Sequence, residues 1–507
     1  MRHFFLLLGV VTLAKLAFAW TGWSESTLIA DDAYYYFTIA RNIVKGLGPT
    51  FDGITPTNGF HPLWLLLLLP AYAAAPDSMW LPIRTALSLN VLFDAVTAIL
   101  LFRMLDSLHG RRAAWFVAAS WVCAPTNAIL AFLGMEGSLA AMLLVGLLAW
   151  ILNPRARERA PRHALVAGLL WGLSGLARTD LLPLAGGVAG IAAVHRPIRW
   201  RARLRWFGLA ALTAGVVSSP WFGWNLQNFG TIEQTSGRAK RHAVYVYGML
   251  PSRLDGPIHI VATGASRLFA PVVTLTGWLT REDFKNQPDK WWPWIAGLWL
   301  VVGSWLAVAG VRTLYAGGFR ELVVLLVIFL ASHVVLYGFV LGFYAPWYAS
   351  AFCAFAAILV GCALARMRLR SLVPVLSLLA CVQVTLPILH ASSAPYVRRG
   401  AEHYWAARLT KIASSYPNGV RVGLFDAGAA GYVAGWIPRL TVVNLDGIVN
   451  NAALSAIEAG RYPEYIVDHV DILLQSPKRS KMFLGEGEYE RLLELWAKRG
   501  VDVDQYR

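Results

Sequence analysis

The chain has 507 residues, of which 57% are hydrophobic and only 15% are charged, and its mean hydropathy is +0.51. This composition excludes an ordinary soluble multidomain protein and indicates a polytopic membrane protein. The net charge of +16 would suggest a nucleic-acid partner in a soluble chain. Here the arginines gather in short loops between apolar runs, as cytoplasmic loops do, so we expect no nucleic acid.

The first apolar run, residues 4–20, is long enough to be a first membrane span that starts in the cytoplasm. Arg2, the apolar core and the sequence Ala17-Phe18-Ala19 would also suit a cleavable signal peptide. Both alternatives place the residues that follow on the external side.

Two adjacent acids, Asp31 and Asp32, follow this run. Keeping charged acids next to hydrocarbon costs free energy, so we expect this pair to have a structural or functional role. Beyond them, apolar residues recur at helical spacing from Tyr36 to Leu47, with Arg41 and Asn42 on the opposite face. The pattern predicts an amphipathic helix along the membrane surface. Asp31 or Asp32 would cap it, which is the simplest role for the pair.

The apolar run at 62–75 is too short to cross a membrane and is expected to lie in its plane or to re-enter. Two more short runs, 164–177 and 181–194, flank Arg178 and Asp180. The other predicted spans are at about 82–103, 113–132, 138–152, 207–224, 292–311, 322–341, 348–365 and 371–390. With the basic loops in the cytoplasm, these spans leave 21–81 and 225–291 outside.

Residues 391–507 are more polar and contain no run of membrane length. Strands are predicted at 421–425 and 440–445, and helices near 402–415 and 488–499. We therefore predict two domains, a transmembrane domain over 1–390 and a small α/β periplasmic domain over 391–507.

The stretch from Asp31 to Trp64, which reads DDAYYYFTIARNI and then TPTNGFHPLW, resembles the start of the GT-C glycosyltransferases. These are polytopic membrane enzymes that use lipid-phosphate-linked sugars, and their first external loop carries an Asp-Asp or Asp-Glu pair followed by juxtamembrane helices. The resemblance implies an all-α GT-C domain of about eleven transmembrane helices. It also implies a retained first span, a bacterial inner-membrane location and an active site facing the periplasm.

The resemblance further implies an inverting transfer of a sugar from a polyprenyl phosphate to an acceptor hydroxyl. The leaving phosphate monoester needs no proton, so one carboxylate acting as general base is enough. The family places this base on the first acid of the pair, here Asp31, while Asp32 orients it or contacts the sugar. A glycosidase would need a matched acid and base instead.

A leaving phosphate needs fixed positive charge. The candidates are Arg178, Lys240, Arg238 and Arg241. The run from Ser236 to Arg241 is similar to a Ser-Gly-x-x-Lys run in related GT-C proteins, and we expect a tight turn with free backbone N–H groups there. A structural Arg178–Asp180 pair and a solvated basic loop are the simpler alternatives.

Further side chains are expected to contact the sugar or the acceptor, although His61 beside Pro62 also suits a structural helix cap. Tyr344 belongs to an aromatic external segment, 343–348, that suits either a membrane-interface belt or sugar stacking. The substrate-binding candidates are Glu136, Asn58, His61, Asp180, Tyr35 and Tyr344.

No P-loop or dinucleotide-binding motif is present, and the four cysteines lie in apolar runs without zinc-ligand spacing. We therefore predict no cofactor. We also predict no obligatory metal, because the second external loop lacks a clear Asp-x-Asp.

The expected partners are membrane lipid, a polyprenyl-phosphate sugar as donor and a glycan, glycolipid or protein as acceptor. Arabinofuranosyl or mannosyl transfer to a cell-envelope glycan or glycolipid is favoured. Two alternatives stay open: a transporter or flippase of lipid-linked sugars, and a metal-dependent transferase that uses diphosphate donors.

Overall fold

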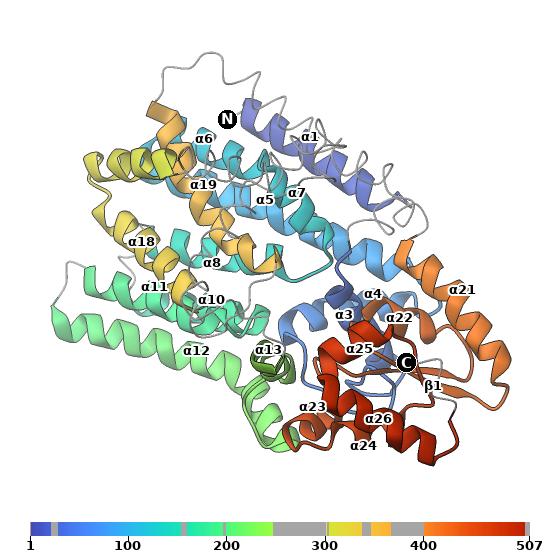
Figure 1. Ribbon diagram of the computed structural model, residues 1–507. Coiled ribbons are helices and arrows are strands. Elements are labelled where there is room, and N and C mark those ends of the chain that lie inside the picture. The colour runs from blue at the N-terminus through green and yellow to red at the C-terminus, as the bar shows by residue number, and fades with distance from the viewer. Residues whose placement is uncertain are drawn as a thin grey trace.

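The computed structural model describes residues 2–21, 29–153, 160–195, 199–246, 301, 304–336, 346–366 and 400–501. A bundle of long helices packs beside a smaller C-terminal part that contains a sheet, residues 400–501, here called the C-terminal domain (Figure 1). Its extent as a separate domain stays a prediction. Helices α3 (Asp31–Val44) and α4 (Pro62–Ala74) lie between the two.

The bundle helices coincide with most of the predicted apolar runs. Their bounds are α1 (Arg2–Ala19), α5 (Leu81–His109), α6 (Arg111–Val122), α7 (Pro125–Phe132), α8 (Gly137–Leu152), α10 (Ala160–Ala177), α11 (Leu181–His195), α12 (Trp200–Phe229), α18 (Arg320–Val335) and α19 (Ala349–Arg366). A further helical run covers 304–316. Predicted helices that fall at 292–300 and 371–390, and the domain boundary near 390, lie outside the described residues.

Within the described residues, α5 is the one helix both long and apolar enough to cross a membrane. Shorter apolar helices accompany it, among them α1, α4, α8, α11 and α19. The multi-pass arrangement and its orientation stay predictions.

The prediction of one continuous helix over 113–132 is wrong. It is divided into α6 and α7, with Cys123 and Ala124 between them and Pro125 at the start of α7. Proline lacks the N–H that would continue the helix, so the break was readable in the sequence. The predicted interruption between α10 and α11 is present, and Arg178 and Asp180 lie in it.

Helix α3 is present as predicted, but its polar face is buried against protein. Its position along the membrane surface stays a prediction. Arg41 is 3% exposed and Asn42 is 5% exposed. The Asn42 side chain donates to the carbonyl groups of Thr50 and Phe51, at 2.9 and 3.1 Å. The Arg41 guanidinium donates to the Tyr432 carbonyl at 2.8 Å. Neither acid caps the helix through its side chain, since Ala30 occupies the N-cap position.

The C-terminal domain contains the predicted α/β elements. Strand β1 (Val420–Leu424) pairs in parallel with β2 (Leu440–Asn444) on one side and β3 (Ile472–Leu473) on the other, giving the order β2-β1-β3. The helices are α21 (Gly400–Ser415), α22 (Gly428–Ala434), α23 (Asn451–Glu458), α24 (Tyr462–His469), α25 (Pro477–Leu484) and α26 (Glu486–Lys498). Buried Val and Leu residues of β1 and β2, with Phe425 directly after β1, contribute to its core.

Candidate active site

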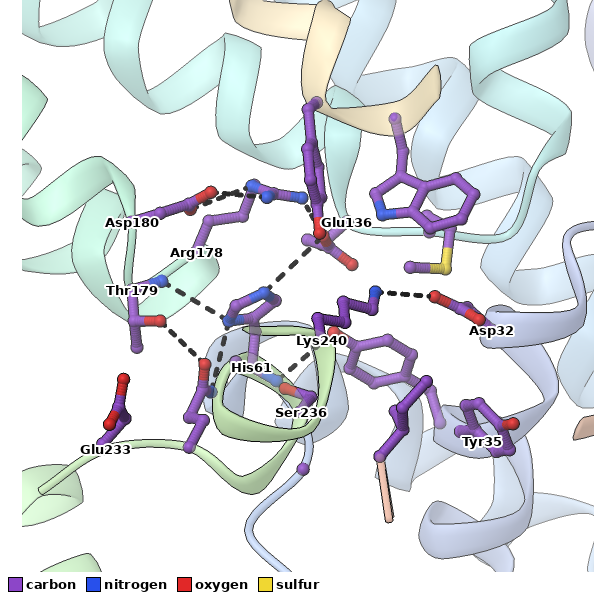
Figure 2. A pocket seen from close by; sticks show the side chains of 18 of the residues that line it. Asp32, Tyr35, His61, Glu136, Arg178, Thr179, Asp180, Glu233, Ser236 and Lys240 are labelled. Carbon is purple, nitrogen blue, oxygen red and sulfur yellow. Dashed lines mark hydrogen bonds and ion pairs between the residues drawn. The ribbon is translucent and has the colours of Figure 1, made fainter. Parts of the chain in front are cut away.

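A cavity of about 250 Å³ lies where the bundle, α3 and the C-terminal domain meet. Its wall also includes the first turns of α13 (Thr235–Val246) and the short helix η2 (Pro346–Tyr348). Figure 2 shows charged side chains from several of these elements pointing toward one another across this space.

Asp32 and Lys240 form the central pair of the cavity. The Asp32 carboxylate, from the first turn of α3, lies 3.1 Å from the Lys240 ammonium of α13 (Figure 2). Burial tends to lower the pKa of Lys240, but the nearby charge of Asp32 outweighs it and holds that pKa above its ordinary value. The ammonium also lies over the rings of Trp347 and Tyr348, at 5.6 and 5.9 Å.

Asp31, the predicted general base, does not line this cavity. Its carboxylate oxygens accept hydrogen bonds from the backbone N–H groups of Gly428 and Ala429, each at 2.9 Å. Burial raises the pKa of Asp31 to about 7, against the opposing effect of those two N–H groups. The structure therefore moves Asp31 from the cavity to the contact between α3 and the C-terminal domain.

Arg178 is held by two carboxylates. Its guanidinium lies 2.5 Å from Glu136, and it donates to both oxygens of Asp180, at 3.1 and 2.6 Å (Figure 2). Its face lies 4.2 Å from the centre of the Tyr348 ring. Because these groups occupy the guanidinium, the geometry favours the structural Arg178–Asp180 pair over phosphate binding. All three charged residues still border the cavity.

His61 lines the cavity and is also a structural connector. Its Nδ1 faces the Thr179 N–H at 3.4 Å and the Gln234 amide nitrogen at 3.3 Å, so the proton of the neutral ring belongs on Nε2. Nε2 lies 3.9 Å from the Glu136 carboxylate. Burial lowers the pKa of His61 to about 4, which keeps the ring neutral at ordinary pH.

The run from Ser236 to Arg241 does not form the expected tight turn. It belongs to α13, and the N–H groups of Gly237 and Arg238 both donate to the Gln234 carbonyl, at 3.1 and 3.2 Å. Of its three cations, Lys240 and Arg241 line the cavity. Arg241 pairs with Glu233, while Arg238 points away and pairs with Glu458 of α23.

Asn58 is fully buried behind the cavity wall, where it binds protein groups. Its side-chain oxygen accepts from the Thr235 N–H at 3.1 Å and from Asn451 at 3.1 Å, and its nitrogen donates to the Glu233 carbonyl at 3.1 Å. The expectation that Asn58 contacts substrate is therefore replaced by a role in joining loops. Tyr344 lies outside the described residues.

Sequence reasoning missed several cavity residues. Trp347 and Tyr348 line the cavity. They belong to the aromatic segment 343–348, from which the sequence analysis selected only Tyr344. Ile448 comes from the C-terminal domain, a few residues after the predicted strand at 440–445. Gln234 also lines the cavity, and it belongs to no motif that would have identified it from the sequence.

The arrangement combines one carboxylate paired with an ammonium, a second group of carboxylates tied to Arg178, and aromatic faces. Such a set suits a polyhydroxylated ligand that carries an anion. Within the described residues, no three His, Cys, Asp or Glu side chains are placed to hold a metal. The absence of an obligatory metal stays a prediction.

Known structures share this fold. ArnT from Cupriavidus metallidurans bound to undecaprenyl phosphate is 16% identical with a TM-score of 0.52, over 92% of this chain and 80% of that one. The apo oligosaccharyltransferase of Archaeoglobus fulgidus is 14% identical with a TM-score of 0.56, over 96% and 71%. No family model and no curated protein sequence matches the chain.

Both are GT-C glycosyltransferases, so this chain has the GT-C fold. The resemblance drawn from the stretch between Asp31 and Trp64 is thus confirmed at the level of the fold.

Proposed function

We propose that this protein is a membrane glycosyltransferase that moves a sugar from a polyprenyl-phosphate donor to an acceptor hydroxyl in the cavity. The observation that carries the proposal is the pairing of Asp32 with Lys240 in the wall of a cavity within a GT-C fold. A carboxylate suited to proton removal and a cation suited to phosphate lie side by side there. The undecaprenyl phosphate bound to ArnT supports a carrier lipid of this class.

In the proposed reaction, the acceptor oxygen attacks the anomeric carbon on the face opposite the phosphate. A C–O bond forms between acceptor and sugar, and the C–O bond between sugar and phosphate breaks. The electron pair of the broken bond stays on the phosphate oxygen, and the acceptor's proton passes to Asp32. The products are an inverted glycoside and free polyprenyl phosphate.

We assign the base to Asp32 rather than Asp31 because a base must reach the acceptor's proton. Asp32 lines the cavity, whereas both oxygens of Asp31 face backbone N–H groups of the C-terminal domain. The assignment therefore differs from the one implied by the family resemblance, by one position in the sequence.

Lys240 is proposed to bind the leaving phosphate, with Arg241 close by in the same wall. A phosphate entering the cavity would give the ammonium a second anion and weaken its hold on Asp32. Donor binding would thus release the base only when the sugar is in place. Stabilising the charge that grows on the phosphate is the larger contribution expected from a fixed cation.

The Glu136–Arg178–Asp180 cluster and the neutral His61 are proposed to orient sugar or acceptor hydroxyls, and the rings of Trp347 and Tyr348 to stack on a sugar face. A pentosyl or hexosyl donor and a cell-envelope glycan or glycolipid as acceptor remain the favoured substrates. No nucleotide or other cofactor enters this scheme.

The proposal is tested by comparing lipids and glycans from a strain lacking the gene with those of the same strain carrying wild-type protein. Mass spectrometry should reveal an acceptor that lacks one sugar, restored by the wild type but not by Asp32→Asn. If purified wild-type protein in liposomes moves polyprenyl-phosphate sugars between leaflets and forms no glycosidic bond, the transferase proposal is contradicted.

A further inference from the structure

Helix α3 presents two adjacent stripes of residues to two different parts of the protein. Residues four apart lie on one side of a helix, one turn from each other. Asp32 and Tyr36 form one such pair and border the cavity. Asp31 and Tyr35 form the neighbouring pair, and their polar atoms contact the C-terminal domain, although the Tyr35 side chain also borders the cavity. The direction of Asp32 therefore depends on how α3 is held on the adjacent side.

The Tyr35 hydroxyl is bound by three groups of the C-terminal domain. It accepts from the Ala427 N–H at 3.1 Å and from the Asn444 amide at 3.2 Å, and it donates to the Asp446 carboxylate at 3.3 Å. With the two bonds of Asp31, this side of α3 is hydrogen-bonded to the end of β2 and to the segments that follow β1 and β2. Figure 2 shows Tyr35 beside Asp32 but turned away from the centre of the cavity.

Helix α22 approaches α3 closely because glycines lie on its contact side, next to Tyr432, whose ring packs against Tyr34 and Phe37 of α3. Gly428, Gly431 and Gly435 are spaced by three and four residues, so they share one side of the helix. A Cβ atom on Gly428 would overlap the Asp31 carbonyl, and one on Gly431 would overlap the Phe51 ring. At Gly435 it would overlap the guanidinium of Arg41. The close approach thus requires residues without side chains.

The same domain supplies part of the cavity wall. Ile448 borders the cavity beside Gly59, where an added Cβ atom would overlap the Ile448 carbonyl. The Ile448 N–H donates to Asp446 at 2.9 Å, and Asp446 also accepts from Tyr35. One turn of the C-terminal domain therefore connects the cavity wall to α3.

We propose that Asp31 is a positioning residue that docks the C-terminal domain on α3 and thereby aims Asp32 into the cavity. In this proposal the C-terminal domain belongs to the active site, because it positions Asp32 and supplies part of the cavity wall. The proposal rests on the proposed function only in its assignment of Asp32 as the base, and the docking itself is measurable without turnover.

Hydrogen–deuterium exchange on the full-length protein in lipid nanodiscs measures the docking. In the wild type, the amides of Gly428 and Ala429 should be protected by the Asp31 carboxylate. In Asp31→Ala, exchange across 427–434 should speed up at least roughly tenfold, because two hydrogen bonds to a carboxylate are lost. In Asp32→Asn, exchange over the same residues should match the wild type.

The same variants are scored for restoring the missing sugar in the deletion strain. Asp31→Ala should restore it poorly and lose the protection of 427–434. Lost transfer with unchanged protection would overturn the positioning role, since Asp31 would then act in the chemistry itself. Full transfer by Asp32→Asn would instead reject the proposed base while leaving the docking result intact.

Gly428→Ala disturbs the same contact without removing a carboxylate. The added methyl would displace α22 from α3, so the variant should show faster exchange over 427–434 and weaker transfer. Gly487→Ala in α26 is the matched control, because a Cβ atom there meets no other group within 4 Å. Full transfer by a Gly428→Ala protein whose α22 amides exchange rapidly would contradict the proposal.

Discussion

Asp32 and Lys240 face each other at 3.1 Å although 208 residues separate them in the chain. The acid is carried by α3 from the first predicted external loop, and the cation by α13 from the second. Because the pair lies in the cavity wall, a change at either residue should alter chemistry more than stability.

Lys240→Met is expected to reduce transfer by roughly 100-fold, because a fixed charge next to the leaving phosphate is lost. Native mass spectrometry with undecaprenyl phosphate should also show weaker binding, and Lys240→Arg should recover part of both. Arg238→Met is the control, since Arg238 pairs with Glu458 outside the cavity. Equal losses in the two methionine variants would argue against a specific role for Lys240.

Arg178→Met should destabilise the protein by about 3–5 kcal/mol, because it leaves the fully buried Glu136 carboxylate, and the partly exposed Asp180 beside it, without their cation. Arg241→Met removes an exposed ion pair, in which 41% of the Arg241 side chain and 40% of the Glu233 side chain are accessible. Its cost should stay below about 1 kcal/mol. Thermal unfolding followed by tryptophan fluorescence compares them, and similar costs would contradict the structural role of Arg178.

His61 should make stability depend on pH in the acidic range. Its pKa is about 4 in the folded protein and 6.5 in the unfolded chain, so the unfolded state binds more protons between these values. The stability contributed by the neutral ring is therefore present above pH 6.5 and is lost as the pH falls toward 4. His61→Gln should flatten this part of the unfolding-temperature profile, and an unchanged slope would exclude His61 as its source.

The bundle contains close helix contacts that tolerate no side chain. A Cβ atom on Gly168 of α10 would overlap the Ala210 carbonyl of α12. Gly168→Ala should therefore cost about 1–3 kcal/mol of unfolding free energy through overpacking. Gly215→Ala, on α12 with open space around it, should be neutral or slightly stabilising, since alanine favours helix. The reverse order of the two unfolding temperatures would contradict the described packing.

Much of the secondary structure could be predicted because apolar runs and their interruptions are local features. The short halves around Arg178, the strand before Asp426 and the helix that starts at Asp31 all follow from the pattern of neighbouring residues. The break before Pro125 was equally local and was overlooked.

The orientation of individual side chains could not be predicted, because it is set by distant partners. Adjacent residues on a helix point about 100° apart, and only the folded C-terminal domain decides that Asp31 faces it while Asp32 faces the cavity. The burial of Arg41 depends in the same way on Tyr432. Arg178 was recognised as a buried charge, but its partner Glu136 lies 42 residues earlier.

The most direct test is the transfer activity of Asp32→Asn, measured with undecaprenyl phosphate binding and unfolding temperature on the same purified protein. Replacing a general base should lower transfer by roughly 10²–10⁴-fold, with the folded structure and lipid binding retained. Asp106→Asn, in the last turn of α5 and not among the residues that line the cavity, should behave as the wild type. Wild-type turnover by Asp32→Asn would contradict the account.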